Sequence, residues 1–235
     1  MTAINQEKAK ALRAIVEPYR KPESTAVCIA SGPSLNQEQI DVVGMAKRKL
    51  NPDRFMVIGC NDNWQWRYEN ECICDHVYAA DTSWWEKHIQ SVKEGAPGAI
   101  KWVPIQESFA RKHGIIMIPC RHGNGLGKEE ALHCMQNSGA QIINLAYQFG
   151  ASKIILIGYD MKVSHGANRK VHWFGDHPKG LRNTPNSYTG WVKHFVQLAK
   201  DLKFLGVDLV NCTPDSALDA KVMRQGKLKA ELLGL

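Results

Sequence analysis

Short apolar runs alternate along the chain with segments in which apolar residues recur every three or four positions. Several runs, such as FMVIG from Phe55 and KIILIG from Lys153, are nearly continuous and rich in β-branched residues. Such runs are typical of strands that are covered on both faces of a sheet, and the segments between them have the spacing of amphipathic helices. The pattern predicts strands at residues 26–30, 55–59, 76–80, 99–103, 115–118, 153–158 and 207–211, and helices at residues 37–49, 82–93, 138–149 and 190–205.

This alternation predicts the fold class and the division of the chain. Strands that alternate with helices indicate an α/β domain with a Rossmann-like, doubly wound, mainly parallel sheet and helices on both faces. We expect an N-terminal helix within residues 1–20, the Rossmann-like domain across residues 21–220 and a basic C-terminal tail across residues 221–235. A stretch rich in His, Gly, Asn and Pro, from about residue 161 to 189, is long for a connection and is predicted to be a functional lid or a disordered insert.

Charge and the absence of long apolar stretches narrow the class of protein. The net charge is +7 and the pI is about 9.0, which suits polyanionic partners such as nucleotides, nucleic acid or acidic glycans, and equally a solvated basic surface. No apolar stretch approaches the roughly 18 residues of a membrane span. The charged N-terminus lacks the apolar core of a signal peptide, so we expect a cytoplasmic protein.

The number and positions of the cysteines also favour the cytoplasm. There are seven, an odd number, and a disulfide framework would use an even one. Cys72 and Cys74 have metal-ligand character but no matching second pair, so the sequence predicts no metal site. Buried thiols in a reducing compartment are predicted for the cysteines in or beside apolar runs, which are Cys28, Cys60, Cys120 and Cys212.

Small polar residues follow the predicted strands at six places. In an open α/β sheet, ligands bind beyond the carboxyl ends of the strands. In SGPS, which starts at Ser31, Gly32 would let a ligand approach the backbone, and Ser34 would cap the next helix and leave its N–H groups facing an anion. We expect the strand ends to meet around one phosphate-bearing ligand, with candidate residues Ser31, Gly32, Pro33, Ser34, Asn61, Asp81, Asn137, Ser138, Gly139, Asp160 and Ser216.

A second group of chemically active side chains lies in the segment VHWFGDHP, residues 171–178. His172, Asp176 and His177 are close together there. Two histidines and a carboxylate can supply a general base and the group that orients it. They can also bind a metal or simply pack, and the pattern leaves these readings open.

Several of these motifs resemble the bacterial sialyltransferases of glycosyltransferase family 42 and a related family of the 6-hydroxymethylpterin diphosphokinase type. The resemblance covers most of the chain, from about residue 25 to 218. A loop of the HWFGDHPKGLRN kind is similar to compact, phage-encoded members. The motifs that carry it are GPSL from Gly32, CN from Cys60, NSG from Asn137, ILIGYD ending at Asp160 and CTPDSAL from Cys212.

The resemblance implies a Rossmann-like glycosyltransferase that binds a cytidine nucleotide-sugar without a metal. Two positions depart from the family pattern. Ser31 stands where the family has an asparagine, and the place of the family's catalytic histidine falls near residues 188–190, which contain none. His177 or His172 would then be the base, with Asp176 orienting it. By position, the resemblance places Gly32, Ser34, Ser138 and Gly139 on the phosphate, Asn61 on the nucleotide or donor sugar, Asp160 on the ribose or base, and Asp81 near a donor-binding asparagine.

Three functions follow as alternatives. A transferase would move a sugar from a nucleotide-activated, CMP-linked donor to a hydroxyl of a glycan, a small metabolite or a modified DNA base, with no required cofactor. A diphosphokinase would need Mg²⁺, with Asp81, Asp160 or Asp176 as ligands. A non-catalytic protein would hold a nucleotide or nucleic acid without turnover. A homo-oligomer is compatible with each.

Overall fold

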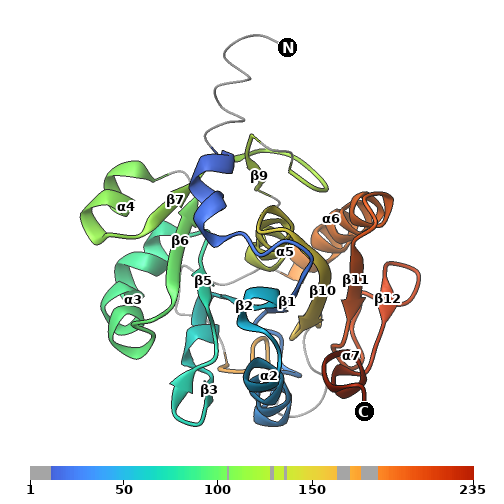
Figure 1. Cartoon of the computed structure of the whole chain (residues 1–235). Coiled ribbons are helices and arrows are strands. Elements are labelled where there is room, and N and C mark those ends of the chain that lie inside the picture. Colours follow the sequence, from blue (N-terminus) through green and yellow to red (C-terminus); the bar gives the residue numbers. More distant parts are fainter. Residues whose placement is uncertain (1–11, 105, 128–129, 135–136, 163–169, 176–184) are drawn as a thin grey trace.

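A computed structural model describes residues 12–104, 106–127, 130–134, 137–162, 170–175 and 185–235 (Figure 1). Within these ranges, eight strands form a central sheet in the order β12-β11-β10-β1-β2-β5-β6-β7, and every neighbouring pair is parallel. The strands are β1 (Ser24–Ile29), β2 (Phe55–Cys60), β5 (His76–Tyr78), β6 (Ile100–Pro104), β7 (Ile116–Ile118), β10 (Ala151–Ile157), β11 (Asp208–Asn211) and β12 (Arg224–Gln225).

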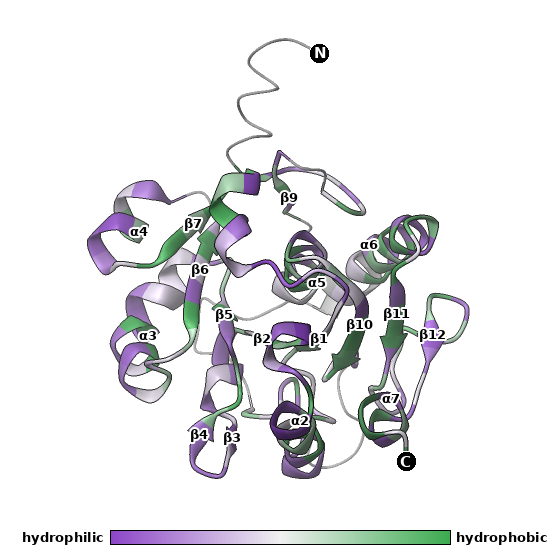
Figure 2. Cartoon of the chain, viewed as in Figure 1, coloured by the Kyte–Doolittle hydropathy of each residue, from purple (hydrophilic) through white to green (hydrophobic). Residues whose placement is uncertain are grey.

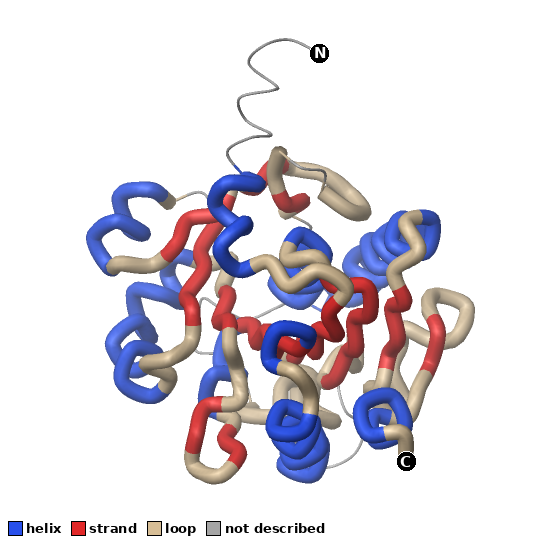
Figure 3. Tube along the Cα trace, viewed as in Figure 1, coloured by secondary structure: helices blue, strands red, loops and turns tan. Residues whose placement is uncertain are grey.

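Helices cover both faces of the sheet (Figures 1 and 3). On one face lie α5 (Ser138–Gln148), α6 (Pro185–Phe204) and the helical residues 12–16. On the other lie α2 (Gln37–Lys49), α3 (Thr82–Gly95), α4 (Glu107–His113) and α7 (Leu228–Leu233). The doubly wound α/β fold predicted from the sequence is confirmed.

The strands supply apolar side chains to both layers. Along β1, Ala26 and Cys28 belong to the core under α5, whereas Val27 and Ile29 belong to the core under α2. Successive side chains of a strand point to opposite faces, so a strand between two helical layers must be apolar at every position. The near-continuous apolar runs in the sequence reflect this requirement. In Figure 2 the hydrophobic colour gathers in the central strands, and α3 and α4 are largely hydrophilic.

All seven predicted strands and four predicted helices are present, with ends that move by a few residues. The short elements were not predicted, because one or two helical turns or a two-residue strand carry too little periodicity to detect. They are the helices α4 and α7, the 3₁₀ turns η1 (Glu17–Tyr19), η2 (Pro52–Arg54) and η3 (Asn61–Gln65), the edge strand β12, the hairpin β3 (Arg67–Tyr68) with β4 (Glu71–Cys72), and the pair β8 (Cys120–Arg121) with β9 (Leu132–His133).

The predicted basic tail is built into the α/β unit. β12 pairs with β11, and α7 packs on α2. Two of its cations, Arg224 and Lys229, have acidic partners: Arg224 lies 2.6 Å from Asp208, and hydrogen bonds from Arg224 lower the pKa of Glu231 to about 2. Lys229 lies 3.4 Å from Glu38. These residues therefore contribute less positive potential than the bare sequence indicates.

One of the predicted free thiols forms a disulfide bridge. Cys120 is bonded to Cys134, with a Cα–Cα distance of 5.9 Å, because the pairing of β8 with β9 brings the two segments together. The prediction of a buried free thiol at Cys120 is therefore wrong. Cys28, Cys60 and Cys212 are buried and free, as expected.

The described residues show neither a membrane helix nor a metal cluster. None of the helices traced in these ranges combines the length and the apolar character that a bilayer crossing requires. Likewise, no group of three or more His, Cys, Asp or Glu side chains in the same ranges is placed to hold a metal ion, and this includes the neighbourhood of Cys72 and Cys74.

A buried histidine in the sheet makes stability depend on pH. His76 on β5 is buried, its Nδ1 accepts a hydrogen bond from Nε1–H of Trp102 at 3.2 Å, and burial lowers its pKa to about 4. Between about pH 4 and the ordinary value near 6.5, the folded protein binds fewer protons than the unfolded chain, so stability falls as pH falls through this range.

We therefore expect the wild type to lose about 1 kcal/mol more than His76→Gln when the pH drops from about 7 to 5.5. Glutamine does not titrate and keeps an acceptor for Trp102. Urea unfolding of both proteins at each pH measures the difference, since all other titrating groups are shared. Parallel pH curves for the two proteins would contradict the assignment.

Candidate functional site

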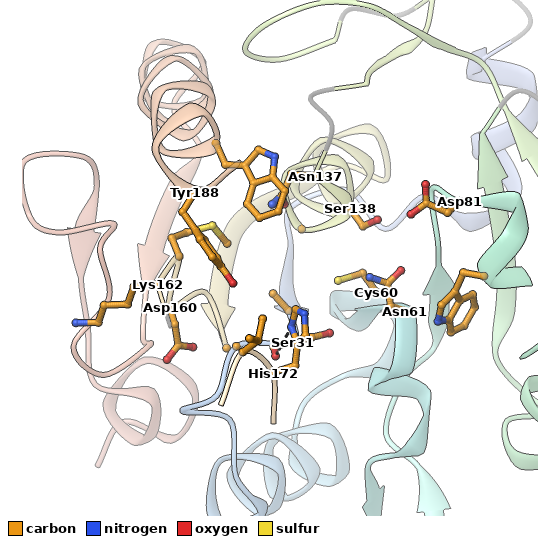
Figure 4. A pocket seen from close by; sticks show the side chains of 18 residues that line it. Ser31, Cys60, Asn61, Asp81, Asn137, Ser138, Asp160, Lys162, His172 and Tyr188 are labelled. Atoms are coloured by element: carbon orange, nitrogen blue, oxygen red, sulfur yellow. Dashed lines mark hydrogen bonds between the residues drawn. The ribbon is translucent and has the colours of Figure 1, made fainter. Parts of the chain in front are cut away.

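The order of strands reverses between β1 and β10. The chain runs outward from β1 through β2, β5, β6 and β7, and then returns to the other side of β1 at β10. In doubly wound sheets the ligand crevice lies at the carboxyl ends of the strands at such a point. A pocket lies there, lined by the ends of β1, β2 and β10, by the N-terminus of α5, and by side chains of α3, α6 and the segment 170–175 (Figure 4). We call it the switch-point pocket.

The pocket brings most of the predicted site residues together. They come from six separate stretches of the chain, which the topology gathers at one edge of the sheet. The cavity volume is about 120 Å³, roughly eight to twelve times what one water needs by this measure. The predicted residues in its wall are Ser31, Gly32, Asn61, Asp81, Asn137, Ser138, Gly139, Asp160 and His172.

Other predicted residues lie elsewhere. Ser216 holds the turn after β11, because its Oγ donates to the carbonyl of Tyr159 at 2.6 Å and accepts from the N–H of Leu218 at 3.0 Å. Pro33 and Ser34 are outside the wall of the pocket. Asp176 and His177 lie outside the described residues, as does most of the predicted lid.

The Gly-Pro-Ser turn after β1 is built around a carboxylate of the protein itself. Asp160, after β10, accepts hydrogen bonds from the backbone N–H of Ser34 at 3.1 Å and from its Oγ at 2.9 Å. The N–H of Gly32 donates to the carbonyl of Gly158 at 2.8 Å. A Cβ on Gly32 would lie 1.8 Å from Oδ2 of Asp160. The group that approaches the glycine closely is therefore Asp160.

This geometry corrects two predictions. The N–H groups of Gly32 and Ser34 do not face a ligand anion, because both already donate to the protein. Ser34 is not the cap of α2 either: Asn36 caps that helix, with its side chain accepting from the N–H of Gln39 in a capping box. Burial raises the pKa of Asp160, and the bonds from Ser34 partly oppose that rise.

The N-terminus of α5 supplies the anion-binding feature that the turn lacks. Asn137 is the cap, and its side chain accepts from the N–H of Ala140 at 3.0 Å. The N–H groups of Ser138 and Gly139 belong to the first turn and have no intrahelical acceptor. The hydroxyl of Tyr159 donates to the carbonyl of Gly139 at 2.9 Å and holds the turn in place. The positive end of the helix dipole therefore faces the pocket.

At the end of β2, Asn61 enters the pocket wall in a left-handed conformation, with φ of +51°. Asparagine tolerates this conformation better than most residues do. The next residue, Asp62, is buried and accepts a hydrogen bond from Nε1–H of Trp84 at 3.1 Å. Trp84 thus forms a fixed part of the pocket wall on the α3 side.

His172 lies over the end of β1 in the pocket wall. Its Nδ1 is 3.2 Å from the carbonyl oxygen of Ser31, as the dashed line in Figure 4 shows. A carbonyl oxygen only accepts, so a hydrogen bond between these two atoms requires a proton on Nδ1, and Nε2 would then be the basic nitrogen of the neutral ring. The backbone N–H of Trp173 donates to the same carbonyl at 3.2 Å.

Few charged side chains line the pocket among the residues that the structure describes. Its wall contains Asp81, Asp160 and Lys162 as charged side chains, and Nζ of Lys162 lies 2.7 Å from a carboxylate oxygen of Asp215. No arginine lines it among the residues described. An anionic group bound here would depend on backbone N–H groups more than on side-chain cations.

Several residues in the pocket wall were not predicted. Tyr188 and Trp191 come from α6, which begins earlier than its predicted start at residue 190. Their rings pack edge to face with centroids 5.4 Å apart, and two aromatic residues at i and i+3 are the sequence signal that could have indicated them. Cys60 is also in the wall, but burial raises its pKa to about 12, which makes it a poor nucleophile.

No model of a known protein family matches this chain, and no curated protein matches it. The class of the protein therefore follows from its fold and its site. It is a Rossmann-like α/β protein with a polar pocket at the switch point of its sheet.

Proposed function

We propose that the protein is a glycosyltransferase that transfers a sugar from a CMP-linked donor to an acceptor hydroxyl. The proposal rests on one observation: the first turn of α5, the amide of Asn61 and the imidazole of His172 all line the switch-point pocket. The first feature suits a phosphate, and the third suits a general base.

The charge of the pocket supports a donor with a single phosphate. Asp81 and Asp160 outnumber Lys162 among the described charged side chains of the wall, and Lys162 already has Asp215 as a partner. A nucleoside triphosphate carries several negative charges, which proteins usually match with cations or a metal. A CMP-linked sugar carries one negative charge on its phosphodiester, which a helix N-terminus can stabilise.

In the proposed reaction, the acceptor hydroxyl gives its proton to Nε2 of His172 while its oxygen bonds to the anomeric carbon of the donor sugar. The bond from that carbon to the phosphate oxygen breaks, and CMP leaves with the electron pair. The N–H groups of Ser138 and Gly139 would stabilise the negative charge that develops on the phosphate.

Thermal unfolding with and without ligand tests the binding step. CMP at about 100 times its dissociation constant is expected to stabilise the protein by about 2.7 kcal/mol, whereas ATP with Mg²⁺ should have much less effect. Stabilisation by ATP with Mg²⁺ and none by CMP would favour the diphosphokinase alternative. Tight CMP binding with no turnover of CMP-linked sugars would favour the binding-protein alternative.

Asn61 provides a sharper test of the site. In Asn61→Gly the left-handed backbone is retained and only the side chain is lost, so we expect CMP affinity to fall about tenfold, the loss of one hydrogen bond. Asn70→Gly is the matched control, because Asn70 also has a positive φ, of +68°, but lies in the β3–β4 turn. Equal CMP affinities in the two variants would remove Asn61 from the site.

A further inference from the structure

A buried asparagine next to the pocket joins the ends of two strands. Asn63, in η3, is fully buried. Its Nδ2 lies 2.7 Å from the carbonyl oxygen of Cys60, 2.9 Å from that of Ile29 and 3.2 Å from Oγ of Ser31. All three acceptors surround Nδ2, and only the nitrogen of an amide can donate. The orientation of the side chain is therefore fixed, and its Oδ1 points away from these three acceptors.

That oxygen accepts a hydrogen bond from the segment that carries His172. Nε1–H of Trp173 donates to Oδ1 of Asn63 at 2.9 Å. The indole also packs on Trp66, with ring centroids 4.5 Å apart. Because the backbone N–H of Trp173 donates to Ser31, both ends of this residue are fixed to the strand edge.

The position of His172 depends on this anchor. The segment turns tightly there, since the N–H groups of His172 and Gly175 each donate to the other's carbonyl, at 3.2 and 3.0 Å. Phe174 stacks on the imidazole at an interplanar angle of 12°. The bond from Trp173 to Asn63 is thus a side-chain link that helps to hold the turn, and the imidazole with it, against the end of β1.

We propose that Asn63 and Trp173 are positioning residues that set the location and the tautomer of His172 in the switch-point pocket. This inference rests on the proposed role of His172 as the base. The pair keeps Nδ1–H of the imidazole on the Ser31 carbonyl, and it thereby keeps Nε2 as the proton acceptor. A base whose ring turned or changed tautomer would present a proton where the reaction needs a lone pair.

The test uses the tautomer of His172, a spectroscopic signature that a general loss of stability would not change. Long-range ¹H–¹⁵N spectra of the full chain at mildly alkaline pH report which ring nitrogen is protonated, and His172→Gln assigns the signal. The wild type is expected to show the Nδ1–H form. In Trp173→Phe the ratio of Nδ1–H to Nε2–H forms should fall about fivefold to tenfold, the effect of one lost hydrogen bond.

Trp66→Phe is the matched control. It makes the same substitution in the neighbouring indole, whose buried Nε1 has no hydrogen-bond partner among the residues that the structure describes, so the tautomer ratio should remain that of the wild type. An equal change in both variants, or no change in Trp173→Phe, would overturn the proposal. If Trp173→Phe does not fold, the wild-type spectrum decides, because an Nε2–H form there would also overturn it.

Binding and turnover separate this inference from the proposed function. With CMP and a CMP-linked sugar as probes, Trp173→Phe should bind CMP as the wild type does and turn the donor over about tenfold more slowly. If the wild type neither binds CMP nor turns over the donor, the proposed function fails. The tautomer measurement still decides whether Asn63 and Trp173 position the imidazole.

Discussion

Gly32→Ala is expected to destabilise the protein by about 3 kcal/mol, because a new methyl group would overlap a backbone oxygen and a carboxylate oxygen that hydrogen bonds hold in place. The Cβ would lie 1.8 Å from Oδ2 of Asp160 and 2.5 Å from the carbonyl oxygen of Gly158. Asp160 is held by Ser34, and the Gly158 carbonyl accepts from the N–H of Gly32 itself.

Equilibrium urea unfolding measures this effect, and Gly98→Ala is the matched control. A Cβ on Gly98 would meet no atom of the described residues within 4 Å, and the φ of Gly98 is not in the left-handed range, so the same substitution should change the free energy of unfolding by less than about 1 kcal/mol. Similar unfolding midpoints for the two variants would show that Asp160 does not occupy the turn after β1.

His172→Gln is expected to lower the turnover of a CMP-linked donor by at least about 10²-fold, the usual contribution of a general base. Glutamine can still donate a hydrogen bond to the Ser31 carbonyl, but it cannot take up a proton. CMP binding should therefore persist, and calorimetry with CMP beside a CMP-release assay separates the two steps.

His194→Gln is the control for this substitution. His194 is on α6, the helix that also lines the pocket, but its Nδ1 contacts Oδ1 of Asn124 at 2.9 Å, and it is not part of the pocket wall. Its turnover should match that of the wild type. Unchanged turnover in His172→Gln would remove His172 from the role and leave His177 as the predicted base.

The fold was predictable because every buried strand needs an apolar run in the sequence, and this signal is repeated along the chain. Strand segments covered on both faces must be apolar at successive positions, and β2 shows this along its whole length, β1 from Ala26 and β10 from Ile154. The convergence of the strand ends was predictable too, since parallel strands place all their carboxyl ends at one edge. Asn61 and Ser138 meet in one pocket for that reason.

The partners within the site were not predictable, because they depend on contacts between distant segments. The sequence around Ser34 indicates an anion at the turn, but it does not distinguish a ligand phosphate from the carboxylate of Asp160, 126 residues away. The same limit applies to Cys120 and Cys134, which only the pairing of β8 with β9 brings together. Local chemistry identifies the type of group that a site needs, and the topology decides which group fills it.

The place of β1 in the sheet has a consequence for biosynthesis. Its neighbour β2 follows it closely in the chain, but its other neighbour is β10, where Ser24 pairs with Ala151. A ribosome must therefore translate more than a hundred residues after β1 before the second edge of β1 can be covered. Until then, a nascent half-sheet would present unpaired backbone groups on one of its most apolar strands, which is the kind of surface that chaperones protect from aggregation.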